Sequence, residues 1–207
     1  MEQYETEEQQ VEAIKRFWKE NGSALIIGAV LGLGGLYGWR YYNDSQIATK
    51  EQASTAYETA TVKLAQDEKG FTEAKVYLDE HAGTGYATLM ALEVAQKAAE
   101  REDFTEAAKQ LEFVANNAEL STVQFVARLR LARIQLAQGE FDLAISSADK
   151  VTADAFKSQS LEIKGDAYLA QQLFDKARAA YSSALENGQR DQVLKMKLDN
   201  LAVAANG

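Results

Sequence analysis

The order of hydrophobic and polar residues divides the chain into an uncharged stretch near the N-terminus and a longer amphipathic region. Residues 21–39 carry no charged side chain, and this length suits a helix that spans a bilayer. Farther along, apolar residues recur at the three- and four-residue spacing of amphipathic helices. The pattern predicts helices over residues 3–19, 21–42, 45–66, 71–81, 85–100, 104–117, 121–137, 141–150, 157–170, 174–187 and 190–203.

Aromatic residues mark both ends of the uncharged stretch. The two tryptophans, Trp18 and Trp39, are about 32 Å apart along a helix, close to the ~30 Å thickness of the hydrocarbon core. The residues expected at the membrane interfaces are Phe17, Trp18, Trp39, Arg40, Tyr41 and Tyr42. A cleaved signal peptide is disfavoured because no small-x-small cleavage pattern follows, and a phosphate-binding loop is disfavoured because the glycines lack a Walker lysine. The sequence therefore predicts a membrane anchor over residues 21–42.

Small residues follow one face of this anchor. Ala24, Gly28 and Gly32 are spaced four residues apart, which allows two helix backbones to approach closely in lipid. The face predicts a partner helix in the membrane. The alternative is that small residues are simply frequent in membrane spans.

Charges beside the anchor indicate its orientation. Lys15, Arg16 and Lys19 precede it, whereas Arg40 and Lys50 follow it. Positive residues favour the cytoplasmic side, so the count places the N-terminus in the cytoplasm and the remainder of the chain across the membrane. The opposite topology, with the repeats in the cytoplasm acting as an adaptor or regulator, remains the alternative.

The segment before the anchor, residues 1–20, has an amphipathic pattern. Val11, Ile14, Phe17 and Trp18 form one helical stripe after an acidic start. This cytoplasmic tail is expected to lie along the membrane surface, and a docking helix for a cytoplasmic protein is the alternative.

A short unit recurs after the anchor. Phe71, Phe104, Phe141 and Phe174 each precede an alanine by three positions, and they are separated by 33, 37 and 33 residues. A period of this size is typical of stacked helical hairpins, in which each unit covers the apolar face of the next. The expected fold class is therefore all-α, an N-terminal single transmembrane helix followed by a tetratricopeptide-like helical-hairpin solenoid.

The last unit shows the tetratricopeptide pattern most completely. Gly165, Tyr168, Ala177, Tyr181 and Ala184 match the small and aromatic positions of that pattern. Earlier units keep small residues at Ala95, Ala107, Ala132 and Ala144 but have Ala98 and Gln135 at the first aromatic position, so they are degenerate copies. Residues 190–207 are expected to form the capping helix that an open stack requires.

Composition excludes several classes of function. The net charge of -9 repels phosphate backbones, so no nucleic-acid partner is expected. The chain has no cysteine and only one histidine, His81, which leaves no metal-ligand cluster and no activated nucleophile. We therefore expect neither an enzyme nor a cofactor.

The remaining chemistry is binding by the inner face of the solenoid. The first helix of each hairpin would line this face, which becomes more acidic toward the C-terminus. The predicted groove residues are Leu89, Leu92, Gln96, Val126, Leu129, Arg133, Gln159, Glu162 and Asp166. The Lys/Asn/Arg set with which some tetratricopeptide domains hold a C-terminal carboxylate is missing. The alternative is that the leucines pack between the repeats.

These segments resemble a known family. The run VEAIKRFWKENGSALIIGAVLGLGGLYGWRYYN within residues 11–43, followed by degenerate repeats, is similar to the YfgM family, the ancillary subunit of the bacterial SecYEG translocon. The resemblance implies a single-pass protein of the bacterial inner membrane with periplasmic repeats. It also implies partnership with SecYEG and with a membrane-anchored periplasmic chaperone of the prolyl-isomerase type, which would receive newly translocated proteins.

The resemblance further implies a link between the cytoplasmic tail and a stress-response regulator. The expected organisation is thus a tail, an anchor, a linking helix that begins the first repeat, a repeat region and a cap. Their boundaries are 1–20, 21–42, 43–66, 67–189 and 190–207.

Overall fold

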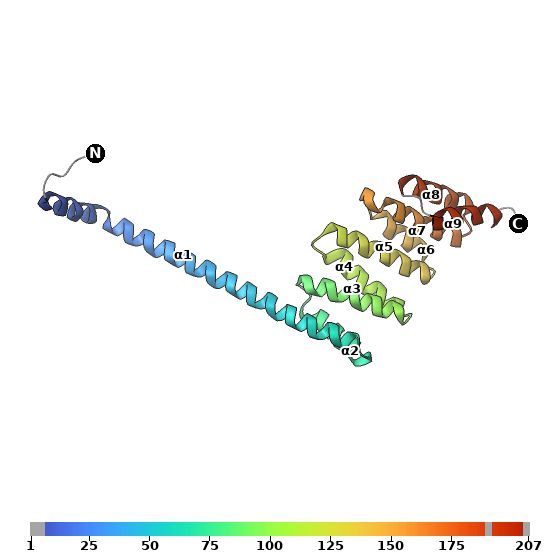
Figure 1. Ribbon diagram of the computed structural model, residues 1–207, viewed down its shortest axis with the longest axis horizontal. Helices are drawn as coiled ribbons and strands as arrows, with labels where there is room; N and C mark the ends of the chain where they lie inside the picture. The colour runs from blue at the N-terminus through green and yellow to red at the C-terminus, as the bar shows by residue number, and fades with distance from the viewer. Residues whose placement is uncertain (1–6, 189–191, 205–207) are drawn as a thin grey trace. The chain divides into compact units, whose positions relative to one another are not determined.

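The computed structural model describes residues 7–188 and 192–204, and every regular element in these ranges is a helix (Figure 1). The all-α fold class is confirmed. The elements are α1 (Glu7–Leu64), α2 (Glu68–Glu80), α3 (Gly85–Glu100), α4 (Phe104–Asn117), α5 (Ser121–Ala137), α6 (Phe141–Asp149), the short 3-10 helix η1 (Asp154–Phe156), α7 (Lys157–Ala170), α8 (Phe174–Asn187) and α9 (Gln192–Ala204).

Five helices, α3, α4, α5, α7 and α8, begin and end at the residues predicted from the sequence. Helix α2 begins three residues earlier than predicted, because Asp67 caps it by accepting a hydrogen bond from the Gly70 backbone N–H at 2.8 Å. Helix α6 ends at Asp149, one residue early, and η1 was not predicted.

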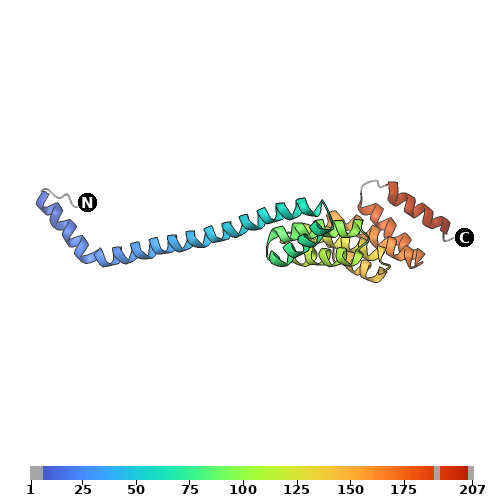
Figure 2. The same cartoon turned by 90° about the horizontal axis from the view of Figure 1, so that it is seen from below.

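The prediction of three separate helices over residues 3–66 was wrong, because α1 is continuous from Glu7 to Leu64. The chain contains no proline, so no residue in this stretch removes a backbone donor and ends the helix. Figure 2 shows that α1 instead bends near its N-terminal end. In that part of the helix, the Asn21 side-chain amide donates a hydrogen bond to the Phe17 carbonyl at 3.3 Å, and Gly22 follows it.

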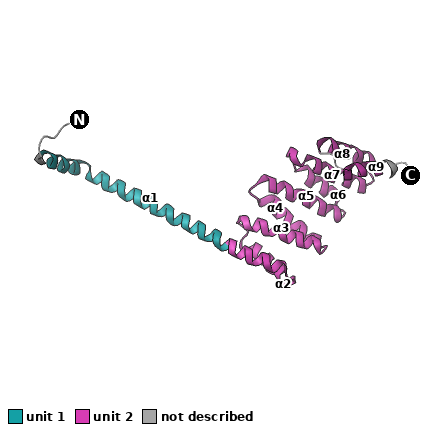
Figure 3. Cartoon of the chain, viewed as in Figure 1, with its two compact units in different colours: residues 1–52 teal, residues 53–207 magenta. Residues whose placement is uncertain are grey.

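The chain forms two units, residues 1–52 and residues 53–207 (Figure 3). The first unit is the greater part of α1. In the second unit, antiparallel pairs of helices stack in chain order: α3 with α4, α5 with α6, and α7 with α8, followed by α9 against α8 (Figure 1). This arrangement is the predicted helical-hairpin solenoid.

The three complete hairpins turn in the same way. Each has a residue with positive φ between its helices: Glu102 (62°), Gly139 (76°) and Gln172 (61°). The next backbone N–H then bonds five residues back at 2.8 Å, from Asp103 to Ala98, from Glu140 to Gln135 and from Leu173 to Tyr168. This is the Schellman ending, which satisfies the last carbonyls of a helix and sets the direction of the following one.

Alanine occupies many of the fully buried positions of the repeats. Ala107, Ala132, Ala144, Ala177 and Ala184 are all completely buried, at 0% exposure. Larger side chains, including Met90, Ile163 and Tyr181, are buried as well, at 0–1% exposure. The small residues that the repeat pattern identified are therefore contact points between helices, as their size requires.

Candidate protein-interaction surfaces

The apolar part of α1 is exposed on all sides within its unit. Leu25, Val30, Leu31, Leu33 and Leu36 are each between 45% and 71% exposed, although all are apolar. A helix that is hydrophobic around its whole circumference is stable in water only when something covers it. In the described part of the chain, α1 is also the one helix that is long and apolar enough to cross a membrane.

The residues predicted at the membrane interfaces lie on the surface of this helix. The aromatic side chains of Phe17, Trp18, Trp39, Tyr41 and Tyr42 are all exposed. Arg40 lies one turn before Asp44, and its Nε is 3.8 Å from a carboxylate oxygen of that residue. The structure contains no membrane, so their place in an interface remains a prediction.

The predicted small-residue face of α1 is open. A Cβ added to Gly28 or Gly32 would meet no atom within 4 Å, and Ala24 is exposed. Nothing within the unit therefore requires glycine at these two positions. The face is available for close packing against another helix, which is the hypothesis that the sequence suggested.

A pocket lies in the repeat stack between α3, α4 and α5, with a volume of about 300 Å³. Three of the predicted groove residues, Leu92, Gln96 and Arg133, line it. The sequence prediction missed the remaining lining residues, which are Ala95, Ala99, Leu111, Arg130 and Ile134. Most of this lining is apolar, and the two arginines come from α5.

The other predicted groove residues of α3 and α5 lie outside this pocket. Leu89 is exposed and Val126 is half-buried. Leu129 is 2% exposed and packs with Ala132, Ala144 and Ile163 in the core. This burial favours the alternative that a leucine packs between repeats at this position.

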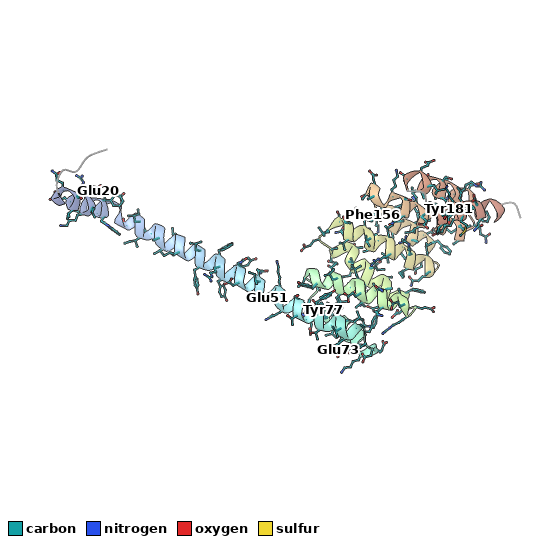
Figure 4. The ribbon with its side chains drawn as sticks, in the orientation of Figure 1. Glu20, Glu51, Glu73, Tyr77, Phe156 and Tyr181 are labelled. Carbon is teal, nitrogen blue, oxygen red and sulfur yellow. The ribbon has the colours of Figure 1, made fainter. Side chains whose placement is uncertain are left out.

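Glu162 and Asp166 of α7 share one cation from the terminal helix. Lys197 of α9 lies 2.7 Å from Glu162 Oε1 and 2.8 Å from Asp166 Oδ1, so the terminal helix brings a cation onto both carboxylates. Asp166 accepts a second hydrogen bond, at 2.7 Å, from the Tyr181 hydroxyl. Figure 4 shows Tyr181 among the side chains at this end of the stack. Gln159, the remaining predicted groove residue of α7, is exposed.

The electrostatics of this network follow from burial and from charge. Burial raises the pKa of Tyr181 well above its usual range, and the hydrogen bond to Asp166 raises it further. Burial lowers the pKa of Lys197, but its hydrogen bonds to Asp166 and Glu162 outweigh burial, so this pKa is raised overall. Both groups therefore remain protonated at neutral pH, and the network holds α9 on the stack.

A second polar contact lies at the start of the stack. The Tyr57 hydroxyl near the end of α1 donates a hydrogen bond to Glu93 of α3 at 2.5 Å. Burial and this bond raise the Tyr57 pKa. The Tyr77 hydroxyl of α2 donates to the Ala53 carbonyl at 2.9 Å (Figure 4). The His81 ring packs against Tyr77 at a tilt of 36°, with ring centroids 4.4 Å apart. Together these side chains tie α1, α2 and α3 to one another.

Within residues 7–188 and 192–204, no group of three or more His, Asp or Glu side chains is arranged to hold a metal ion. Two surfaces of the described residues are open to a partner: the apolar helix and the pocket with its arginine edge. Such surfaces are suited to contacts with other proteins.

Comparisons with known proteins agree with this architecture. Residues 15–203 match the family described as "Tetratricopeptide repeat-like domain". The chain is 32% identical to a protein of Escherichia coli (strain K12) named "Ancillary SecYEG translocon subunit", over 98% of this chain and 100% of that protein. A protein of Haemophilus influenzae with the same name is 31% identical over 94% of this chain and 97% of its own length.

A solved structure shares the fold. MamA from Desulfovibrio magneticus RS-1, residues 41 to the end, superposes with a TM-score of 0.59 at 16% sequence identity. The match covers 74% of this chain and 85% of that chain. At this identity the likeness concerns the helical-repeat fold alone.

Proposed function

We propose, because the chain belongs to the family of ancillary SecYEG translocon subunits, that it is a non-enzymatic, membrane-tethered scaffold at the translocon. Its repeats would pass newly translocated proteins to periplasmic chaperones through protein–protein contacts. The observation that carries the proposal is the continuity of α1, in which one helix contains both an uncharged apolar segment and the first residues of the repeat unit.

The proposed location is the bacterial inner membrane, crossed once, with the N-terminus in the cytoplasm and the repeats in the periplasm. Lys15, Arg16 and Lys19 before the span outnumber Arg40 and Lys50 after it, which supports this orientation. Protease added to intact spheroplasts tests it. Digestion of the repeats would support the proposal, and full protection of the repeats would refute it.

The proposed contact inside the membrane uses Ala24, Gly28 and Gly32. Since both glycines are open in the structure, leucine at these positions leaves the folded chain undisturbed and blocks only an external helix. Gly28→Leu with Gly32→Leu should reduce co-purification with SecYEG several-fold.

The matched control for this contact is Gly34→Leu with Gly38→Leu. These glycines have the same four-residue spacing and are also open, but Gly34 lies roughly 120° around the helix from Gly28. Equal loss of co-purification in both pairs would show that span hydropathy, and not the small-residue face, determines association.

The proposed contact of the repeats is with translocating chains and with a membrane-anchored periplasmic chaperone of the prolyl-isomerase type. A photoreactive amino acid at Leu92, in the pocket, should crosslink to both. The same group at Leu143 of α6, which is exposed but outside the pocket, is the control. Crosslinks at Leu92 that are equal to those at Leu143, or that persist when secretion is blocked, would contradict handover through this surface.

A second candidate function is that of an adaptor for a stress-response signalling protein, acting through the cytoplasmic tail or with inverted topology. The observation in its favour is that Val11, Ile14, Phe17 and Trp18 are all exposed on α1 ahead of the apolar segment. Replacement of Ile14 and Phe17 by serine would alter stress signalling and leave SecYEG association intact if this function is separate.

A further inference from the structure

Helix α5 is basic although the chain as a whole is acidic. It contains Arg128, Arg130 and Arg133 and no aspartate or glutamate, whereas the chain carries a net charge of -9. These cations are not needed for solubility, because the net negative charge of the protein already provides it. The contacts of the three arginines therefore show which of them remain available to bind an external group.

Only one of the three arginines has a partner in the described chain. Arg128 donates a hydrogen bond to the Ala115 carbonyl near the end of α4 at 3.0 Å, which suits a cation near a helix C-terminus. Within residues 7–188 and 192–204, Arg130 and Arg133 make no side-chain hydrogen bond or ion pair. By contrast, Arg101 pairs with Glu68, and Arg178 lies 3.4 Å from Asp175.

The carboxylates of α3 are already bound by other groups. Glu93 accepts the hydrogen bond of Tyr57 at 2.5 Å, and Glu100 accepts one from Lys97 at 2.9 Å. Gln96, which lines the pocket, also donates a hydrogen bond from its side-chain amide to Glu100. Both carboxylates of α3 are therefore already engaged by other side chains.

Both unpaired arginines line the pocket between α3, α4 and α5. They are three residues apart on α5, so they are neighbours on one helix face. Leu92, Leu111 and Ile134 supply large apolar side chains to the same pocket, and its volume of about 300 Å³ is at the lower end for ligand sites. The site thus combines an apolar lining with two free guanidinium groups.

From this combination we infer that the pocket binds an extended segment of a newly translocated polypeptide, in which a large apolar side chain lies next to a carboxylate. The apolar side chain enters between Leu92, Leu111 and Ile134, and the carboxylate lies against Arg130 and Arg133, whose planar donors match its two oxygens. The inference rests on the proposed function, because it names the class of client that the repeats accept.

The test measures peptide binding to the full chain in lipid nanodiscs, with empty nanodiscs subtracted. The probes are fluorescein-labelled peptides of the sequence GSALFXLAGS, in which X is Asp, Asn or Lys. A fourth peptide, GSALF with a free C-terminal carboxylate, distinguishes a chain end from an acidic side chain. Anisotropy titrations at low and high salt give the relative affinities.

The variants are Arg130→Gln with Arg133→Gln, and the control is Arg178→Gln, which removes an exposed arginine outside the pocket. We expect the Asp peptide to bind about fivefold more tightly than the Asn peptide and more tightly still than the Lys peptide. This preference should disappear in the double variant, persist in Arg178→Gln and weaken at about 0.5 M salt. Circular dichroism checks that every variant remains folded.

Three outcomes would overturn the inference. Equal affinity for the Asp and Asn peptides would show that the arginines do not select a carboxylate, and the scaffold function would stand if the crosslinks at Leu92 remain. Binding of only the peptide with a free C-terminal carboxylate would show that the pocket accepts a chain end and not an internal segment. Absence of binding together with absence of crosslinks at Leu92 would refute both the inference and the proposed function.

Discussion

Replacing Gly165 by alanine should destabilise the last hairpin by overpacking it. A Cβ at this position of α7 would lie 2.4 Å from Cε1 and 2.5 Å from Cδ1 of Tyr181 on α8. Carbon atoms in contact prefer about 3.5–4.0 Å, so the ring would have to move by about 1 Å. Tyr181 is 0% exposed and bound to Asp166, which leaves the ring little freedom.

The expected magnitude follows from two opposing contributions. Overpacking a core typically destabilises by about 1–3 kcal/mol, and an overlap this large with a ring held on both sides belongs at the upper end. Alanine stabilises a helix interior by about 1 kcal/mol relative to glycine. The net loss should therefore be about 2 kcal/mol, which lowers the melting temperature by about 4–8 °C for a unit of this size.

Thermal unfolding of the full chain in detergent micelles, followed by circular dichroism at 222 nm, measures this change. Gly85→Ala is the control, because a Cβ at the start of α3 would meet no atom within 4 Å. In a Tyr181→Leu background, where the ring is gone, Gly165→Ala should be neutral or stabilising. A melting temperature equal to that of the control, or a loss that persists without the ring, would refute the reasoning.

Three further predictions concern hydrogen bonds and protonation. Lys197→Met should leave Glu162 and Asp166 without their cation and destabilise the repeats by roughly 2 kcal/mol, with faster amide exchange in α9 as the specific readout. Because the Lys197 pKa is raised on folding, this contribution should be complete at neutral pH and should fall above about pH 10, where the lysine of the unfolded chain loses its proton. Urea titrations should therefore show a smaller difference in stability between the unmodified chain and Lys197→Met at about pH 10.5 than at about pH 7. Tyr77→Phe should remove the bond to the Ala53 carbonyl and lower stability by about 1 kcal/mol, and unchanged urea unfolding would contradict this.

The sequence predicted the repeat architecture because its signals are local. The spacing of Phe104, Phe141 and Phe174 marks the first residue of three equivalent helices, and the turn before each of them has the same geometry. Gly165 and Tyr181 both match positions of the repeat pattern, and the structure places them in contact. A period in the sequence determines such contacts because each hairpin packs against its neighbours in the same way.

The rotation of α5 could not be predicted from its sequence. Its apolar residues surround the whole helix, so no stripe indicates which side faces the groove. The repeat register inferred from the sequence placed Leu129 in the groove. In the structure Leu129 is buried, and Arg130 and Ile134 line the pocket. One signal was present in the sequence, namely three arginines and no acidic residue over residues 121–137.

The network at the end of the stack was missed for a different reason. Glu162 and Asp166 are one turn apart on α7, so the sequence indicates that they share a face, but their cation comes from α9, a different helix. Long-range pairs of this kind depend on how the capping helix docks. No local pattern encodes that docking.

The apolar helix α1 and the pocket together explain how weak contacts with a client would suffice for a scaffold. Exposed ion pairs contribute about 0–1 kcal/mol each, and an apolar pocket of about 300 Å³ accepts little more than a single large side chain, so intrinsic affinity for a client segment should be low. In the proposed function, tethering beside the translocon would raise the effective concentration of emerging chains to roughly the millimolar range without any added contact. Under the proposed function low affinity would be useful, because a client held weakly by Arg130 and Arg133 would dissociate fast enough to be transferred to a chaperone.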